Sequence, residues 1–175
     1  MPSPRVPGRP PPSVLGHVLD GALLLPSTAC TIWYMIEVTR TSSAPADRLW
    51  TVMSDVRRWP DWMPTVDAVT PLDPDRPDEV GASYTVEQPG LARAVWTFTA
   101  IDEGRSFTWE STRPGIRSVG THVLRPAADG TTSIELAITW TGFLAPLVRL
   151  ALGRKTRDYV TREADALDAT AAARA

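Results

Sequence analysis

The stretch from Ile36 to Pro64 constrains the fold of this chain more than any other. It reads IEVTRTSSAPADRLWTVMSDVRRWPDWMP, in which a short alternating pattern gives way to apolar residues at spacings of three and four. Pro60 and Pro64 then end the helical pattern, or restrict it to one short extra turn. The stretch therefore predicts a strand, a helix and a second helical turn, followed by a return to extended chain.

The remainder of the chain alternates apolar and polar residues with a period of two, as half-buried strands do. Turn signals rich in Gly, Pro and Asp separate the alternating segments. The pattern predicts six further strands, at residues 65–70, 82–88, 92–101, 106–111, 117–125 and 132–141. The strand at 132–141 alternates most clearly, and its one apolar and one polar face indicate an antiparallel sheet with one solvated side. The strand at 117–125 alternates poorly, since Val119 and Val123 have the opposite parity.

Strand parity also predicts which side chains point inward. The inner face is expected to carry the apolar residues of the fourth, fifth and seventh strands: Ala94, Trp96, Phe98, Ala100, Phe107, Trp109, Ile134, Leu136, Ile138 and Trp140. The chain has seven Trp residues, a high count for 175 residues. Because Trp buries a large surface, this face predicts either a large core or the wall of a ligand pocket.

A helical period begins at Phe143 and continues to about Ala169. Its apolar residues predict one stripe packed against the sheet. The stripe comprises Leu144, Leu147, Val148, Ala151, Leu152, Tyr159, Val160 and Leu167. The arginines between Arg149 and Arg162 fall mostly elsewhere, and indicate a solvated face or, less simply, a surface for an anionic partner. The predicted class is α+β, with a curved antiparallel sheet around a long C-terminal helix and two short helices after the first strand.

These elements carry a resemblance to a known family. The segment APADRLWTVMSDVRRWPDWMP, with Asp55, Trp59, Pro60 and Trp62, resembles the opening of the START-like helix-grip (SRPBCC) superfamily, in its polyketide cyclase/dehydrase-type branch. Gly81 and the closing segment TGFLAPLVRLALGRKTRDYV also fit that pattern. The resemblance implies a helix-grip domain over residues 35–170, with an incompletely filled core between the sheet and the C-terminal helix. It does not select a function, because such folds serve many.

The resemblance and the aromatic inner face together favour binding of a small hydrophobic, ring-containing or lipid-like ligand. The residues expected to contact it are Tyr84, Trp96, Phe98, Phe107, Trp109, His122, Leu136, Ile138, Trp140, Val148, Leu152 and Tyr159. The simpler interpretation is that these side chains only fill the core. Trp59 and Trp62 either gate the cavity mouth or hold the helical turn against the sheet, and we favour the second role.

His122 is the candidate for acid–base chemistry. If Leu124 faces inward opposite Ile134, then His122 shares that parity, and an imidazole in a cavity can exchange protons near neutral pH. The alternative is a histidine packed beside the core or pointing outward. Tyr159 lies one helical turn from Glu163 and offers a hydroxyl donor, although a tyrosine with its hydroxyl in water is equally ordinary. One histidine is thin support for catalysis, so a carrier is favoured over an aromatase/cyclase- or dehydratase-type enzyme, with a protein-interaction module third.

Composition excludes several other classes. A net charge of −2 gives no electrostatic reason to expect a nucleic-acid partner. The single cysteine, Cys30, rules out an internal disulfide and a multi-cysteine metal site, and no cofactor or metal motif is found. No apolar run is long enough for stable membrane insertion. The sequence leaves open whether the protein is a monomer or a dimer.

Residues 1–34 form a different segment, which we call the N-terminal arm. It begins MPSPRVPGRPPPSV, continues with the apolar run VLGHVLDGALLLP and ends before Met35. Three interpretations are open: a disordered or loosely helical arm, sequence upstream of a true start at Met35, or an export signal. His17 and Asp20 within the apolar run disfavour export, so a cytoplasmic protein is expected. Lys155 is the only lysine among the basic residues, and this composition bias indicates a bacterial origin.

Overall fold

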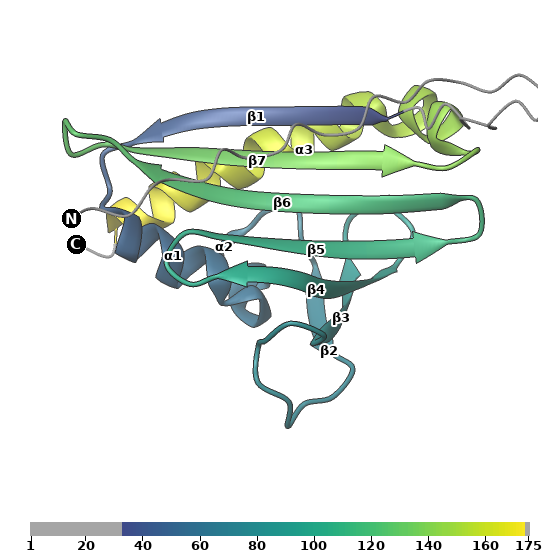
Figure 1. The fold of residues 1–175 in the computed structure, drawn as a ribbon, viewed down its shortest axis with the longest axis horizontal. Helices are drawn as coiled ribbons and strands as arrows, with labels where there is room; N and C mark the ends of the chain where they lie inside the picture. Colours follow the sequence, from purple (N-terminus) through teal and green to yellow (C-terminus); the bar gives the residue numbers. More distant parts are fainter. Residues whose placement is uncertain (1–32, 174–175) are drawn as a thin grey trace, which may run out of the picture. The chain divides into compact units, whose positions relative to one another are not determined.

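A computed structural model describes residues 33–173 of the chain. The expectations for residues 1–32 of the N-terminal arm lie outside the described residues. The sheet has seven antiparallel strands in the order β1-β7-β6-β5-β4-β3-β2 (Figure 1). The strands are β1 (Tyr34–Ser42), β2 (Ala68–Pro71), β3 (Ser83–Glu87), β4 (Ala94–Asp102), β5 (Ser106–Arg113), β6 (Ile116–Pro126) and β7 (Thr132–Thr141).

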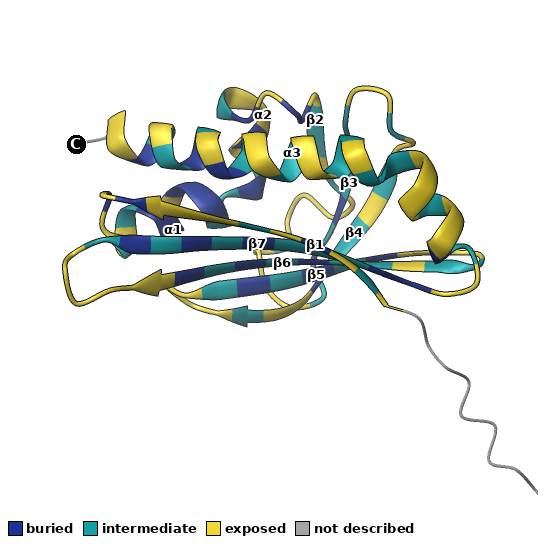
Figure 2. Ribbon diagram, turned by 90° about the horizontal axis from the view of Figure 1, so that it is seen from above, coloured by how far each residue is buried: buried dark blue, intermediate teal, exposed yellow. Residues whose placement is uncertain are grey.

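The helices occur where the sequence predicts them. Between β1 and β2 lie α1 (Ala46–Ser54), the single 3-10 turn η1 (Val56–Arg58) and α2 (Trp59–Trp62), with Pro60 tolerated in the first turn of α2. The chain closes with α3 (Ala145–Ala173), which crosses one face of the sheet (Figures 1 and 2). The predicted α+β helix-grip class is therefore confirmed, with element ends that move by a few residues.

The core lies where α1 and the second half of α3 meet the concave face of the sheet. Leu49, Val52 and Met53 of α1 are buried, as are Ala164 and Leu167 of α3. Small side chains at Ala164 and Ala171 allow this part of α3 to approach its neighbours closely. The first half of α3 has few buried residues (Figure 2), and its side chains Val148 and Leu152 line a cavity.

One strand departs from the predicted alternation. The pairing of β4 with β5 shifts register between Phe98 and Ala100, so Ile101 rather than Ala100 pairs with Phe107. A bulge adds one residue to a strand and reverses the parity beyond it. Ala100, predicted to face inward, is therefore exposed, and Ile101 packs against the core.

The predicted stripe of α3 is also partly wrong. Leu147 is 61% exposed, and Ala151 is exposed as well. Val148 and Leu152, on the neighbouring helical positions, face the sheet side and line a cavity. The first turns of α3 thus present apolar side chains in two directions, whereas the sequence pattern alone suggested one.

Candidate ligand-binding cavity

Two adjoining chambers lie between the sheet and α3. The outer chamber has a volume of about 210 Å³ and the inner chamber about 90 Å³. They adjoin because six residues line both: Val86, Gln88, Leu91, Trp96, Ile138 and Thr156. Taken together, the chambers approach the lower end of the range of about 300–1,000 Å³ typical of ligand pockets.

The outer chamber is bounded by the sheet and by the first half of α3. Trp140 and Ile116 belong to the strand walls, and Val148 and Leu152 to the helix wall. Besides the shared Gln88 and Thr156, its polar side chains are Ser111, Arg113 and Ser118 of β5 and β6. An apolar molecule can therefore bury its surface here with few polar groups to satisfy.

The inner chamber is walled by aromatic rings. Trp96 and Trp109 lie on adjacent strands with ring centroids 5.1 Å apart, and Trp59 of α2 packs edge-on against Trp109 at 5.0 Å. Trp59 is only 2% exposed, and its indole N–H donates to the carbonyl of Met53 over 3.1 Å. Trp59 thus anchors the α2 turn as favoured from the sequence, and it also lines the chamber. Trp62 does not line either chamber.

The polar end of the inner chamber is formed by His122 of β6 and Glu163 of α3. Strand pairing places His122 opposite Leu136 on the inner face, with 5% of its surface exposed. Its Nε2 atom lies 2.7 Å from Oε1 of Glu163. The side chain of Glu163 is 15% exposed. Such a short contact between largely buried groups requires a proton between them, shared as a charge-assisted hydrogen bond.

The other nitrogen of His122 has no partner. Nδ1 is buried and makes no hydrogen bond to any described residue. The ring itself is held by Phe107, stacked at 4.2 Å and 17°, and by Trp59 at 5.6 Å. If Nε2–H donates to the Glu163 carboxylate, Nδ1 keeps a free lone pair, which is the form of a histidine base. The arrangement can therefore accept a proton or a hydrogen bond.

Further polar groups line the inner chamber around this pair. Gln88, Thr156 and Tyr159 contribute side chains, although the Tyr159 hydroxyl already donates to the carbonyl of Pro89 over 2.6 Å. The amide of Gln88 likewise donates to the carbonyl of Thr65 over 3.2 Å. The first hydrogen bond ties the loop after β3 to α3, and the second ties Gln88 to the segment between α2 and β2.

The structure divides the sequence-predicted contact residues among three places. Trp96, Trp109, His122, Leu136, Ile138 and Tyr159 line the inner chamber, and Trp140, Val148 and Leu152 line the outer one. The remaining three, Tyr84, Phe98 and Phe107, are core residues that line neither chamber. Phe98 and Phe107 instead border a separate cavity of about 270 Å³ beside α1, whose walls include Asp55, Asp78 and Glu103.

Tyr84 has a structural partner of its own. Its hydroxyl donates to the Asp78 carboxylate, which also accepts from the Arg57 guanidinium over 2.9 Å. Burial, assisted by the hydrogen bond to Asp78 and by that carboxylate's charge, raises the pKa of Tyr84 to about 12. Tyr84 therefore ties the loop between β2 and β3 to the sheet, and it lines neither chamber.

Glu163 is the functional candidate that sequence reasoning missed. It is 41 residues from His122 in sequence, and only the folded helix brings the two together. Its position in the sequence could have indicated this role. Glu163 lies four residues after Tyr159 and four before Leu167, on the face of α3 predicted to be apolar. A carboxylate on such a face needs a buried partner.

The described residues contain no cluster of three His, Cys, Asp or Glu side chains suited to a metal ion.

The fold and the cavity define a helix-grip domain with a space for a hydrophobic ligand. The chain matches the model of the family described as polyketide cyclase / dehydrase and lipid transport over residues 35–172, and it belongs to that family. A comparison with functionally curated proteins finds no match. None of the helices in residues 33–173 combines the length and apolar character that a membrane crossing requires.

Solved structures share the fold at low sequence identity. Norcoclaurine synthase from Thalictrum flavum, in complex with dopamine and hydroxybenzaldehyde, aligns with a TM-score of 0.65 and 17% identity, covering 90% of this chain and 96% of that one. The Zhui aromatase/cyclase from a Streptomyces species aligns at 0.63 and 18%, covering 82% and 96%. The di-domain aromatase/cyclase StfQ of the steffimycin biosynthetic pathway aligns at 0.64 and 14%, covering 81% and 51%.

Proposed function

We propose that the domain binds a small, largely apolar, ring-containing molecule in the two chambers and acts as a carrier or sequestering protein. The observation that carries the proposal is the adjoining pair of chambers whose shared walls include Trp96 and Ile138. Aromatic walls offer flat surfaces on which a ring can stack, and burial of apolar area supplies the affinity.

The polar end of the inner chamber would orient the ligand. The free Nδ1 of His122 supplies one hydrogen-bonding position in an otherwise apolar wall. A few polar groups in an apolar pocket are the usual source of orientation and specificity. The similar norcoclaurine synthase was solved with dopamine and hydroxybenzaldehyde, which are small ring-containing molecules with polar substituents. A ligand of that general character fits the proposal.

A cavity-filling substitution tests the binding proposal. The probe is the fluorescent aromatic anion anilinonaphthalene sulfonate, titrated into the purified full chain. Ile138 lines both chambers, so the larger side chain of Ile138→Trp occupies space in them. This substitution is expected to weaken probe binding by about tenfold or more, equivalent to about 1.4 kcal/mol. Thr139→Trp, one residue along β7 and outside both chambers, is the matched control. Equal affinity for Ile138→Trp and the parent chain would refute the proposal.

The His122–Glu163 pair favours a second candidate, an aromatase/cyclase- or dehydratase-type enzyme acting on a polyketide-like substrate. A histidine held by a carboxylate through one nitrogen, with the other nitrogen free, is an arrangement that can move protons. Cyclisation and dehydration of a poly-β-ketone chain both need a proton removed from carbon and a proton delivered to oxygen. The chambers would hold the chain folded while the pair exchanges these protons.

His122→Ala separates the two candidates. In an enzyme, turnover of a synthetic poly-β-ketone thioester to an aromatic product should fall by about 10²-fold or more, with little change in affinity. In a carrier, the parent chain forms no product, and the substitution changes ligand affinity by about 0.5–1.5 kcal/mol, the size of one hydrogen bond. Mass spectrometry of the product mixture and probe titration of both chains provide the two readouts.

A further inference from the structure

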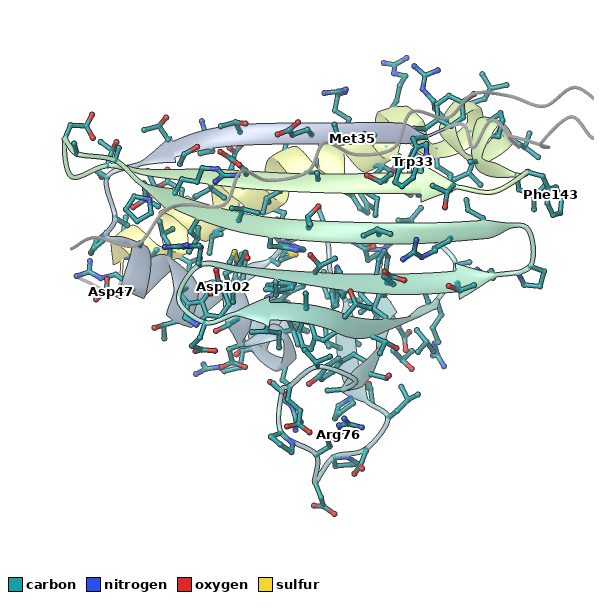
Figure 3. All side chains as sticks on the ribbon, in the orientation of Figure 1. Trp33, Met35, Asp47, Arg76, Asp102 and Phe143 are labelled. Atoms are coloured by element: carbon teal, nitrogen blue, oxygen red, sulfur yellow. The ribbon has the colours of Figure 1, made fainter. Side chains whose placement is uncertain are left out.

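The start of α3 and the turn before it expose large apolar side chains to solvent. Phe143, Leu147 and Leu150 are 81%, 61% and 85% exposed. Leu147 and Leu150, three residues apart, share one face of α3, and Phe143 lies in the turn just before the helix. Figure 3 shows the Phe143 side chain at one end of the domain. We call these three residues the apolar stripe. Adjacent exposed apolar side chains of this size usually mark an interaction surface.

The apolar stripe lies in a basic stretch of the sequence. From Gly142 to Arg157 the sequence contains no Asp or Glu, and it contains Arg149, Arg154, Lys155 and Arg157. None of these four forms an ion pair with a carboxylate of residues 33–173. In a chain of net charge −2, this end of α3 is thus a local concentration of cations. A partner that fits it must combine apolar character with negative charge.

The apolar stripe also lies beside the outer chamber. Val148 and Leu152, on the same turns of α3, line that chamber. The end of β5 contributes Arg113 to the chamber wall, and Gly115, just beyond it, lies close to the Phe143 ring. One short segment of α3 therefore borders the chamber on one side and presents the apolar stripe on the other.

We propose that the apolar stripe and its basic residues form a docking surface for an anionic lipid bilayer, on which the protein sits peripherally. Apolar side chains of such a surface enter the boundary between headgroups and acyl chains, while Lys and Arg are attracted by anionic headgroups. The charge pattern favours this occupant over two others. A second copy on a two-fold axis would set the same basic residues against each other. The N-terminal arm carries Arg5 and Arg9 against the single carboxylate of Asp20, so it is not complementary either.

The docking surface is independent of the ligand proposal. Binding to a bilayer uses side chains that point away from the chambers, so it needs no ligand. Vesicle binding can fail while Ile138→Trp still weakens probe binding, and the reverse can also occur. Each of the two proposals is therefore tested by its own measurement.

Co-sedimentation with lipid vesicles tests the docking surface. The full chain is mixed with vesicles of phosphatidylcholine alone, or with about 30 mol % phosphatidylglycerol added to supply anionic headgroups. The parent chain should partition onto the anionic vesicles at least about tenfold more strongly, and added salt should weaken that binding. Phe143→Ser with Leu150→Ser should abolish it. Arg154→Gln with Arg157→Gln should reduce it by about fivefold per removed charge.

Matched control substitutions lie elsewhere on the domain. Leu72→Ser with Val80→Ser changes two side chains that are 57% and 52% exposed in the loop between β2 and β3, and Arg58→Gln removes an exposed charge beside α2. Both controls should bind like the parent chain. Equal partition onto the two vesicle types, absence of partition, or equal loss in the controls would overturn the proposal. So would a dimer that Phe143→Ser with Leu150→Ser converts to monomer without any vesicle binding.

Discussion

At the scale of single residues, the position of the Trp109 ring depends on a glycine. Gly120 pairs with Trp109 across β5 and β6, and a Cβ atom at Gly120 would lie 2.4 Å from the indole Nε1 atom. Gly120→Ala should therefore displace the ring toward the inner chamber and lower the free energy of unfolding by about 1–3 kcal/mol. The double variant Gly120→Ala with Trp109→Phe should lose at least about 1 kcal/mol less free energy of unfolding than the sum of the two single variants. A double-mutant cycle measured by urea unfolding would show this difference. Additive effects of the two changes would contradict this account.

Tyr84 gives the domain a specific response to high pH. Its pKa is raised to about 12 in the folded chain, above the value near 10 expected in the unfolded chain. The protonated Tyr84 hydroxyl therefore contributes its full share to the free energy of unfolding below about pH 10. This contribution is lost as the pH rises toward 12, because the unfolded chain releases the hydroxyl proton at a lower pH than the folded chain does. Tyr84→Phe should remove that part of the pH dependence, measured by urea unfolding from pH 9 to 12. An unchanged slope would show that Tyr84 is not responsible.

The polar end of the cavity shows what residue-level sequence reasoning can predict. Parity placed His122 on the inner face because Leu124 and Ile134 fixed the register, and the structure pairs those two residues. Glu163 was not predicted as its partner, since helix periodicity gives a face but not which strand lies beneath it. Tyr84, Phe98 and Phe107 were correctly expected to be buried, but parity cannot tell a cavity wall from a core residue.

At the scale of elements, the entry into α3 depends on close contact between two turns. Gly142 has φ of +109°, and a Cβ atom there would lie 2.4 Å from the carbonyl oxygen of Gly115. Gly142→Ala should cost about 1–3 kcal/mol more than Gly104→Ala, because backbone atoms must move. Gly104 also has positive φ but has nothing near its would-be Cβ, so its substitution reports the conformational cost alone, about 1–2 kcal/mol. Equal melting temperatures for the two variants would argue against the contact.

Element boundaries and faces were predictable only where the alternation is uninterrupted. The strand at 132–141 was predicted with the bounds that β7 has, because no bulge or proline interrupts it. In β4 the bulge after Phe98 reversed the faces of Ala100 and Ile101, and apolar residues on both faces gave no warning. The same ambiguity affected α3, where Leu147 and Val148 are both apolar and only packing decides which faces the sheet.

At the scale of the whole molecule, the two halves of α3 make different contacts. The second half of α3 is fixed to the sheet edge, where Asp168 accepts a hydrogen bond from Ser42 over 2.5 Å and Asp165 pairs with Arg40. Ala164 and Leu167 are buried in the same region. The first half borders the chambers and has few buried side chains. Regions with fewer buried contacts open more readily, so the route by which a ligand enters is expected at this end.

The folded domain begins with the first residues of β1. We propose that residues 1–32 are dispensable for folding, and that Tyr34, the residue before Met35 in β1, adds to the stability of the domain. Tyr34 pairs with Trp140 in the sheet, and the Arg149 guanidinium lies 5.1 Å from the centre of its ring. A chain beginning at Trp33 should therefore match the full chain in free energy of unfolding. A chain beginning at Met35 should remain folded but lose about 1–2 kcal/mol, since it forfeits one strand pair and a cation–π contact. Equal stability of the two truncated chains in urea would show that Tyr34 contributes nothing, and a large loss for the chain beginning at Trp33 would assign the missing stability to residues 1–32.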